Sequence, residues 1–264
     1  MKIQRIILDL DYVLEDVDYP ALYDPHRMKA LTRHIMATSL VKKMFPEPSG
    51  VTVGDFGCGR GMTSIALAEL GYSVFAIDAD EDRVESIRRK TVEGYIRCIV
   101  SNIEDLDMPL NSLDAALAIE LIEHCAYPEN MLEQMLGYVR PGGVLILTTP
   151  NGAILGSRLI LKLPTYRQVL GMEDRSTLVR KQYTADVHLL RFKLEEIECT
   201  LPPETEVMEM GYFGLSAILL NKYTYHLYRL LPLDLVYDFI WAFPRIPIIN
   251  RKVASKVYAV VRKI

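Results

Sequence analysis

The chain has 264 residues, 50% of them apolar, with 30 Lys and Arg against 34 Asp and Glu and a net charge of −4. This length and composition predict one sizeable core, hence a single domain over residues 1–264, and the weak acidic excess disfavours a nucleic-acid-binding protein. No apolar run reaches the roughly 18 residues of a membrane span, and charges interrupt the short apolar run near the N-terminus, so neither a transmembrane helix nor a signal peptide is predicted.

Residues 1–48 are predicted to be an N-terminal helical segment. Apolar residues recur at roughly helical spacing over residues 27–45, and Pro46 and Pro48 follow directly, so we expect one helix that ends there. Three tyrosines (Tyr12, Tyr19 and Tyr23) lie among acids and prolines before it. The simplest interpretation is that they pack the helix onto the edge of a sheet.

The most informative stretch is residues 51–82. A β-branched run leads into the glycine-rich turn DFGCGRG at residues 55–61, a helix is expected at 63–70, and a second buried strand at 74–77 ends on Asp78. Glycines at 57, 59 and 61 permit positive φ, and they let backbone amides approach a ligand above the helix N-terminus. An acid at the tip of the second strand is placed to accept hydrogen bonds from both ribose hydroxyls. A nucleoside-containing ligand is therefore predicted.

The spacing of the glycines identifies the class of ligand. The dinucleotide pattern G-x-G-x-x-G would need glycine at Met62 or, in the other frame, at Ser64. Instead, D-x-G-x-G-x-G followed 17 residues later by Asp78 resembles the S-adenosylmethionine (SAM) loop of class I methyltransferases. The resemblance implies cofactor contacts from ten residues: Asp55, Gly57, Cys58, Gly59, Gly61, Asp78, Ala79, Asn102, Ile103 and Glu120. Asp55 could equally orient the turn without contacting the ligand.

Residues 82–91 are expected to form a helix and residues 95–100 a third strand. The following SNIEDL segment resembles the adenine-binding segment of the family, in which an acid accepts a bond from the adenine amino group. This chain has Asn102 at that position, and an amide oxygen can still accept the bond.

In this family the N-terminal segment often lies across the cofactor, so Tyr19 or Tyr23 could also contact SAM or substrate.

A cluster of ionisable residues follows the predicted fourth strand, residues 113–119. It reads ELIEH, with Glu120, Glu123 and His124 beside the expected ligand, because ligands of open α/β sheets bind outside the carboxyl ends of the strands. A helix at 131–139, a PGG turn and a strand at 144–148 ending in TTPN come next. From about residue 50 to 150 the chain resembles ubiquinone-biosynthesis O-methyltransferases.

The rest of the chain resembles the family only loosely. Residues 152–187 are expected to be a mostly irregular, lid-like insertion, followed by a short helix start at 191–197 and strands at 206–212 and 257–261. Residues 215–251 form a long aromatic insertion that prolines 232, 244 and 247 divide into short helices, and residues 221–264 carry a local charge of +6. This segment could cap a lipophilic acceptor, rest on an anionic membrane surface, or simply pack on the sheet.

His124 is the first candidate for a general base and His188 is the second. His124 could equally be a packing residue after the fourth strand. A metal is the sharper alternative: Glu120, Glu123, His124 and His188 have the order and spacing of the E-x-x-E-H plus downstream histidine site of small-RNA 2′-O-methyltransferases. Two carboxylates would favour magnesium, and two imidazoles would admit manganese, iron or zinc.

We therefore expect an α/β, Rossmann-like fold with a seven-stranded, mostly parallel sheet, helices on both faces and an antiparallel last strand, as the resemblance implies. The expected activity is SAM-dependent O-methylation of a small or lipophilic hydroxyl compound. Carbon or nitrogen methylation, a non-catalytic SAM-binding protein and an RNA 2′-O-methyltransferase stay open as alternatives, and aminopropyl transfer is disfavoured. Four isolated cysteines without a C-x-x-C pair indicate reduced thiols, hence a cytoplasmic protein without structural zinc.

Overall fold

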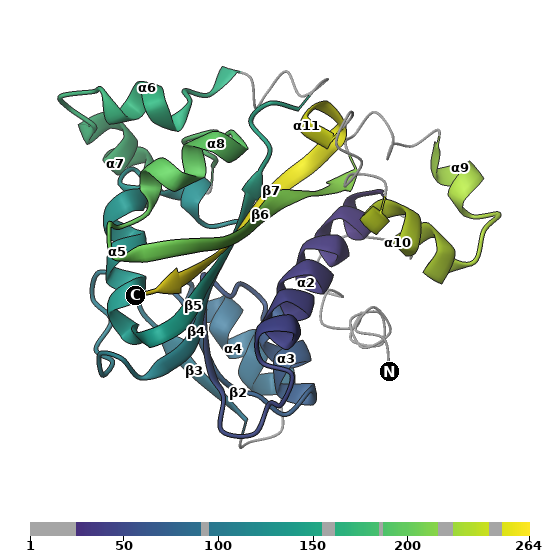
Figure 1. Cartoon of the computed structure of the whole chain (residues 1–264), viewed down its shortest axis with the longest axis horizontal. Coiled ribbons are helices and arrows are strands. Elements are labelled where there is room, and N and C mark those ends of the chain that lie inside the picture. Colours follow the sequence, from purple (N-terminus) through teal and green to yellow (C-terminus); the bar gives the residue numbers. More distant parts are fainter. Residues whose placement is uncertain (1–24, 91–94, 155–161, 185–186, 216–223, 243–249) are drawn as a thin grey trace.

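A computed structural model describes residues 25–90, 95–154, 162–184, 187–215, 224–242 and 250–264. Its centre is a seven-stranded sheet in the order β3-β2-β1-β4-β5-β7-β6 (Figure 1). The strands are β1 (Thr52–Phe56), β2 (Ser73–Asp78), β3 (Ile96–Val100), β4 (Leu113–Ile119), β5 (Val139–Pro150), β6 (Thr205–Leu215) and β7 (Ala254–Lys263). β1 to β5 are parallel, whereas β7 is antiparallel to both of its neighbours. The predicted Rossmann-like class is confirmed.

Helices cover both faces of this sheet (Figure 1). On one face, α5 (Pro128–Tyr138), α6 (Tyr166–Leu170) and α8 (Leu194–Ile197) pack into a core with the central strands. On the other, α2 (Pro25–Met44), α3 (Met62–Glu69), α4 (Glu81–Lys90) and α10 (Leu233–Ala242) contribute to two adjoining apolar clusters. Burial on both faces explains why β4 reads as a nearly continuous apolar run in the sequence.

Two sequence predictions differ from the structure. In residues 152–187, the described part contains two helices that the sequence did not indicate, α6 and α7 (Ser176–Thr184). α6 begins with a capping box in which Thr165 and Gln168 exchange hydrogen bonds, and its Tyr166 and Val169 are fully buried. The predicted PGG turn instead belongs to β5, where Gly142 has a φ of 76° and the register with β4 shifts. Short helices and bulged strands leave weak periodic signals, which explains both errors.

The insertion before β7 contains α9 (Thr224–Tyr228), α10 and α11 (Asn250–Val253), in line with short helices separated by prolines. The expected roles of Tyr12, Tyr19 and Tyr23 fall outside the described residues, as does the side chain of Trp241. Among the helices that are described, none combines the length and apolarity needed to cross a membrane.

Candidate functional site

A cavity of about 600 Å³ lies at the carboxyl ends of β1 to β4, where the strand order reverses between β1 and β4. Six of the ten predicted cofactor residues line it: Gly57, Asp78, Ala79, Asn102, Ile103 and Glu120. The other four do not line the cavity: Asp55, Cys58, Gly59 and Gly61. They belong to the glycine-rich turn that adjoins the cavity through Gly57, and their contacts with a cofactor stay predictions.

The glycine-rich turn has the backbone that its sequence requires. Gly57, Gly59 and Gly61 have φ values of 66°, 56° and 80°. A Cβ on Gly57 would lie 2.8 Å from the Leu121 side chain, and one on Gly61 would lie 2.6 Å from Ile87. The N–H of Cys58 donates to the carbonyl oxygen of Ile77 at 3.0 Å and ties the turn to β2. Glycine is thus needed both for the left-handed backbone and for close packing.

Asp78 ends β2 and faces the cavity with a carboxylate of fixed orientation. Its Oδ2 accepts the N–H of Gly59 at 2.8 Å, and its Oδ1 accepts the N–H of Asp80 at 3.0 Å. Each carboxylate oxygen has capacity for a second hydrogen bond. The arrangement suits a ligand that presents two neighbouring hydroxyl groups.

Asp55 is buried beneath this turn, where its Oδ2 accepts a hydrogen bond from Ser64 Oγ at 2.6 Å. Burial raises the pKa of Asp55 to about 7, and the nearby charge of Asp78 adds to the shift. These contacts support the interpretation that Asp55 orients the turn. Its direct contact with a cofactor stays a prediction.

The segment after β3 is held against α5. Gln134 Nε2 donates to the carbonyl oxygen of Ile103 at 2.7 Å, and the Tyr138 hydroxyl donates to that of Leu106 at 2.7 Å. Asn102 is exposed, with its amide 3.5 Å from Asp105 Oδ2. Residues 101–104 of this segment line the cavity where the adenine was expected.

Glu120, directly after β4, has a left-handed backbone with a φ of 55°. Its carboxylate forms a buried ion pair with Lys256 of β7 and accepts a hydrogen bond from Thr148 Oγ1 at 2.9 Å. Burial alone would raise the pKa of Glu120, but the positive charges of Lys256 and Arg33 hold it below its ordinary value. Neither cation was identified from the sequence as a partner of this residue.

Glu123, His124 and His188 form a compact cluster. One ligand atom from each residue lies within 4.8 Å of the others. The two imidazole rings pack edge to face, with their centroids 4.9 Å apart. The N–H groups of Leu189 and Leu190 both donate to the Glu123 carbonyl oxygen, which brings His188 to the end of β4. Glu120 is not in this cluster, so three of the four predicted metal-binding residues come together.

The Glu123 carboxyl is almost completely buried. Its Oε2 accepts a bond from Thr149 Oγ1 at 2.8 Å, whereas its Oε1 has no hydrogen-bond partner and lies 4.0 Å from His188 Nε2. Burial, followed by repulsion from Glu120, raises the pKa of Glu123 to about 8. A buried carboxyl oxygen without a partner is unfavourable, and a cation or a donor at this point would satisfy it.

His124 lines the cavity and has a defined tautomer when neutral. Its Nδ1 lies 3.0 Å from the carbonyl oxygen of Val187, which can only accept a hydrogen bond. Nδ1 therefore carries the proton, and the lone pair of the neutral ring is on Nε2. In this state the ring can accept a proton or bind a metal through Nε2.

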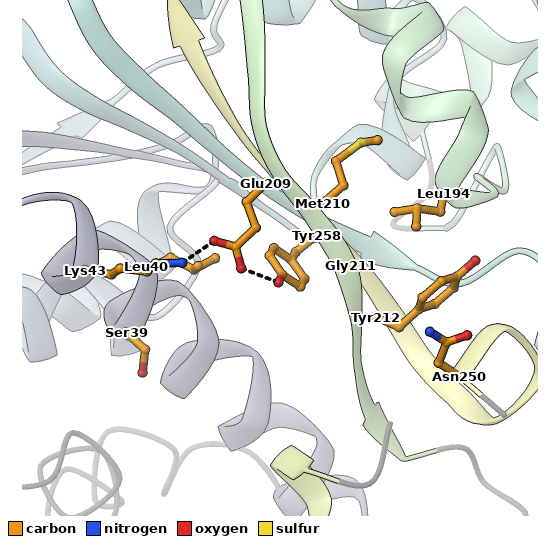
Figure 2. Close-up of a pocket in the computed structure, with 10 residues that line it drawn as sticks. All are labelled: Ser39, Leu40, Lys43, Leu194, Glu209, Met210, Gly211, Tyr212, Asn250 and Tyr258. Carbon is orange, nitrogen blue, oxygen red and sulfur yellow. Dashed lines mark hydrogen bonds and ion pairs between the residues drawn. The ribbon is translucent and has the colours of Figure 1, made fainter. Parts of the chain in front are cut away.

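A second cavity, of about 610 Å³, lies along the edge strand β6 between α2 and α11 (Figure 2). Glu209 bridges the ammonium group of Lys43 and the hydroxyl of Tyr258, which donates to Glu209 Oε1 at 2.7 Å. None of the predicted site residues lines this cavity. The predicted site residues that line a cavity are thus at the strand ends, not along β6.

Comparisons with known proteins agree with this assignment. The family described as "Methyltransferase domain" matches residues 54–147, which include the glycine turn, Asp78 and the cluster after β4. This part of the chain is therefore similar to methyltransferase domains. A ubiquinone biosynthesis O-methyltransferase from Xanthomonas axonopodis is 33% identical to it over 127 residues, which are 44% of this chain and 53% of that protein.

Some relatives match a longer part of the chain than residues 54–147. A ubiquinone biosynthesis O-methyltransferase from Caulobacter vibrioides is 33% identical over 172 residues, 63% of each chain. The chain spans about half the length of most of the curated relatives it matches. An S-adenosylmethionine dependent methyltransferase from Mesorhizobium loti has the same fold, with a TM-score of 0.58, 15% identity and coverage of 88% of this chain and 98% of that one.

Proposed function

We propose that the protein is an enzyme that transfers the methyl group of SAM to a hydroxyl group of a small or lipophilic compound. The observation that carries this proposal is that one cavity is lined both by Asp78, from the glycine-turn motif, and by His124, from the cluster after β4. The curated relatives are named as O-methyltransferases, which supports oxygen as the acceptor atom. RNA is a less favoured acceptor than a small molecule, because the chain has a net charge of −4 and RNA-binding proteins usually present a basic surface.

The residues present fit SAM, because Asp78 can hold a ribose and the turn can hold the amino-acid end. When bound, SAM supplies a methyl group on a positively charged sulfur that a hydroxyl oxygen can attack. His124 Nε2 would take the proton of that hydroxyl, and the bond from Nδ1 to the Val187 carbonyl would keep the ring in the required tautomer. Holding the acceptor oxygen in line with the methyl group would lower the barrier by several kcal/mol.

The test is methyl transfer from isotopically labelled SAM to a panel of catechols and other phenols, with the product's methylated atom assigned by NMR. Methyl groups on oxygen support the proposal. Transfer to carbon or nitrogen would correct the reaction class, and tight SAM binding without transfer would favour a regulatory SAM-binding protein. Mass spectrometry of metabolites that co-purify with the protein would narrow the choice of acceptors.

We propose, as the alternative to a His124 base, a divalent metal held by Glu123, His124 and His188. The orphaned Glu123 Oε1 beside two imidazoles supports it, since a cation would satisfy that oxygen and favour the ionised carboxyl. One carboxylate and two imidazoles match manganese, iron or zinc better than magnesium. When bound, the metal would polarise the acceptor hydroxyl.

If the metal is required, a chelator should abolish methyl transfer, added divalent ion should restore it, and His188→Ala should both mimic chelation and lower the metal content found by elemental analysis. His226→Ala, which removes an exposed histidine of α9, is the matched control. If His124 instead acts only as a base, activity should ignore the chelator and fall in His124→Ala. A chelator-insensitive enzyme with a fully active His124→Ala variant would contradict both versions.

We propose that the insertion around α9 and α10 meets a lipid surface or a lipophilic acceptor. α10 packs Val236 and Ile240 against α2, yet Leu227, Leu230 and Leu235 are 61%, 79% and 53% exposed. Exposed apolar residues favour a lipid interface, and the net charge of +2 over residues 215–251 favours anionic lipid. Wild type should sediment with anionic vesicles at low salt, and Leu227→Ser/Leu230→Ser should not; equal binding of both would contradict the proposal.

All four cysteines are free thiols, which supports a cytoplasmic location.

A further inference from the structure

The second cavity, along the edge strand β6, is a groove between helices (Figure 2). Four consecutive residues of the strand line it: Glu209, Met210, Gly211 and Tyr212. α2 borders the strand on one side, and α8 and α11 border it on the other. Because α2 and α8 cover opposite faces of the sheet, the cavity follows the edge of the sheet itself.

The backbone of β6 is open to a further strand along this groove. Within the described residues, β6 has a neighbouring strand on one side only. Alternate residues of an antiparallel pair turn N–H and C=O towards the partner strand, so the others turn them outward. Every residue from 205 to 212 is at least partly exposed, and β6 contains neither the proline nor the lysine that protect many edges. The register shift of β6 lies between Val207 and Glu209, before most of the residues that line the cavity.

The acids of β6 indicate the charge of a strand that would fit there. Glu209 is opposite Val260, which packs in the cluster with α2, and Glu206 is opposite Arg262 on the same face. The cations that now pair with them, Lys43 and Arg262, are 62% and 42% exposed, so both ion pairs are weak and easily exchanged. Opposite charges on neighbouring strands stabilise a sheet, which favours basic side chains on this face of an added strand.

The other face of β6 is apolar. Met210 and Tyr212 pack against the core beneath α8, and Leu194 of α8 lines the cavity beside them. An added strand would therefore alternate basic and apolar side chains. A second copy of this chain fits poorly, because β6 against β6 would bring glutamates together and would press the helices that border both edges against each other.

We infer that the β6 edge is a docking site for an extended segment of another protein, which adds an eighth strand to the sheet. Main-chain hydrogen bonds to β6 would supply affinity, and the alternating side chains would supply specificity. The segment carries lysine or arginine on the α2 face and apolar residues on the α8 face. This inference does not depend on methyl transfer, since SAM is proposed to bind in the other cavity.

The probe is a fluorescently labelled synthetic peptide in which lysine and valine alternate, with both ends blocked. Fluorescence anisotropy should show saturable binding to wild type, and a peptide of alternating glutamate and valine should bind at least tenfold more weakly. The lysine peptide with N-methylated backbone nitrogens keeps its charge but cannot donate main-chain hydrogen bonds. It should also bind at least tenfold more weakly, which separates strand addition from simple attraction of charges.

Two variants test the position of the site. Ser39→Trp should place an indole ring in the groove and weaken the lysine peptide at least tenfold, whereas Lys42→Trp, at an exposed position of α2 outside the cavity, should not weaken it. Glu206→Lys/Glu209→Lys should weaken it by a similar factor, and Glu133→Lys on α5 should have little effect. Circular dichroism checks that each variant is folded, and the charge variants test the site if Ser39→Trp is not.

The inference is overturned if wild type does not bind the lysine peptide saturably, or if the N-methylated peptide binds as well as the unmodified one. Equal binding by wild type and the folded groove variants also overturns it. Analytical ultracentrifugation tests the other occupant: a wild-type dimer that becomes monomeric in Ser39→Trp but not in Lys42→Trp would assign the groove to a second copy and overturn the inference.

Discussion

Replacing Asp78 with alanine should weaken the binding of S-adenosylhomocysteine by about 100-fold or more. The variant loses an ionised acceptor for two hydroxyl groups, and a hydrogen bond to a charged group contributes roughly 1.5–3 kcal/mol. The glycine turn should also loosen, because Asp78 Oδ2 accepts the N–H of Gly59. Isothermal titration calorimetry on the purified proteins measures the effect.

Two variants sharpen this experiment. Asp78→Asn keeps the shape and one acceptor oxygen, so its affinity should fall between those of wild type and alanine. Glu104→Ala removes an exposed acid that lines the same cavity and should change the affinity little. Equal affinities for wild type and Asp78→Ala would remove Asp78 from the site, and an effect of Glu104→Ala as large as that of Asp78→Ala would point to a general loss of negative charge.

Lys256→Met should destabilise the fold by about 3–5 kcal/mol, because it leaves the Glu120 carboxylate buried without its counter-ion. The side chains of Lys256 and Glu120 are only 12% and 10% exposed. Arg140→Met is the matched control: it breaks the ion pair with Asp114 at the other end of β4, where the arginine is 48% exposed, and should lose no more than about 1 kcal/mol. Urea unfolding of the three proteins compares their free energies of unfolding.

The double variant Lys256→Met/Glu120→Met tests the cause. If the buried charge is responsible, replacing both partners with apolar side chains should recover much of the lost stability. If the double variant is as unstable as the sum of the two single variants, the pair contributes through packing, and the electrostatic explanation is wrong.

The parts of this fold that could be predicted are those in which neighbours in sequence are also neighbours in space. The glycine turn, the strand that ends on Asp78 and the ELIEH cluster are local patterns, and the structure places Asp78, Glu120 and His124 around one cavity. The strand order followed from the family resemblance. The roles of these residues in binding and catalysis stay predictions until ligands are measured.

What could not be predicted depends on contacts between distant residues. Lys256 is 136 positions from Glu120, and its sequence context is an ordinary strand, so nothing local identifies it as the partner of a site residue. Arg33 looks like one more surface cation of an N-terminal helix. The short helices α6 and α7 depend on capping and burial, and their few turns give little periodicity to read.

The place of β7 has a consequence for how the protein is made. Among the described strands, β6 pairs only with β7, which follows it in the sequence by about forty residues and lies between β5 and β6 in the sheet. During translation, β6 is therefore synthesised before the strand it pairs with. It stays unpaired until β7 has also been synthesised. The same delay applies to the Glu120 ion pair, since Lys256 belongs to β7. Slow translation between residues 216 and 253 would prolong exposure of an unpaired strand and should promote aggregation.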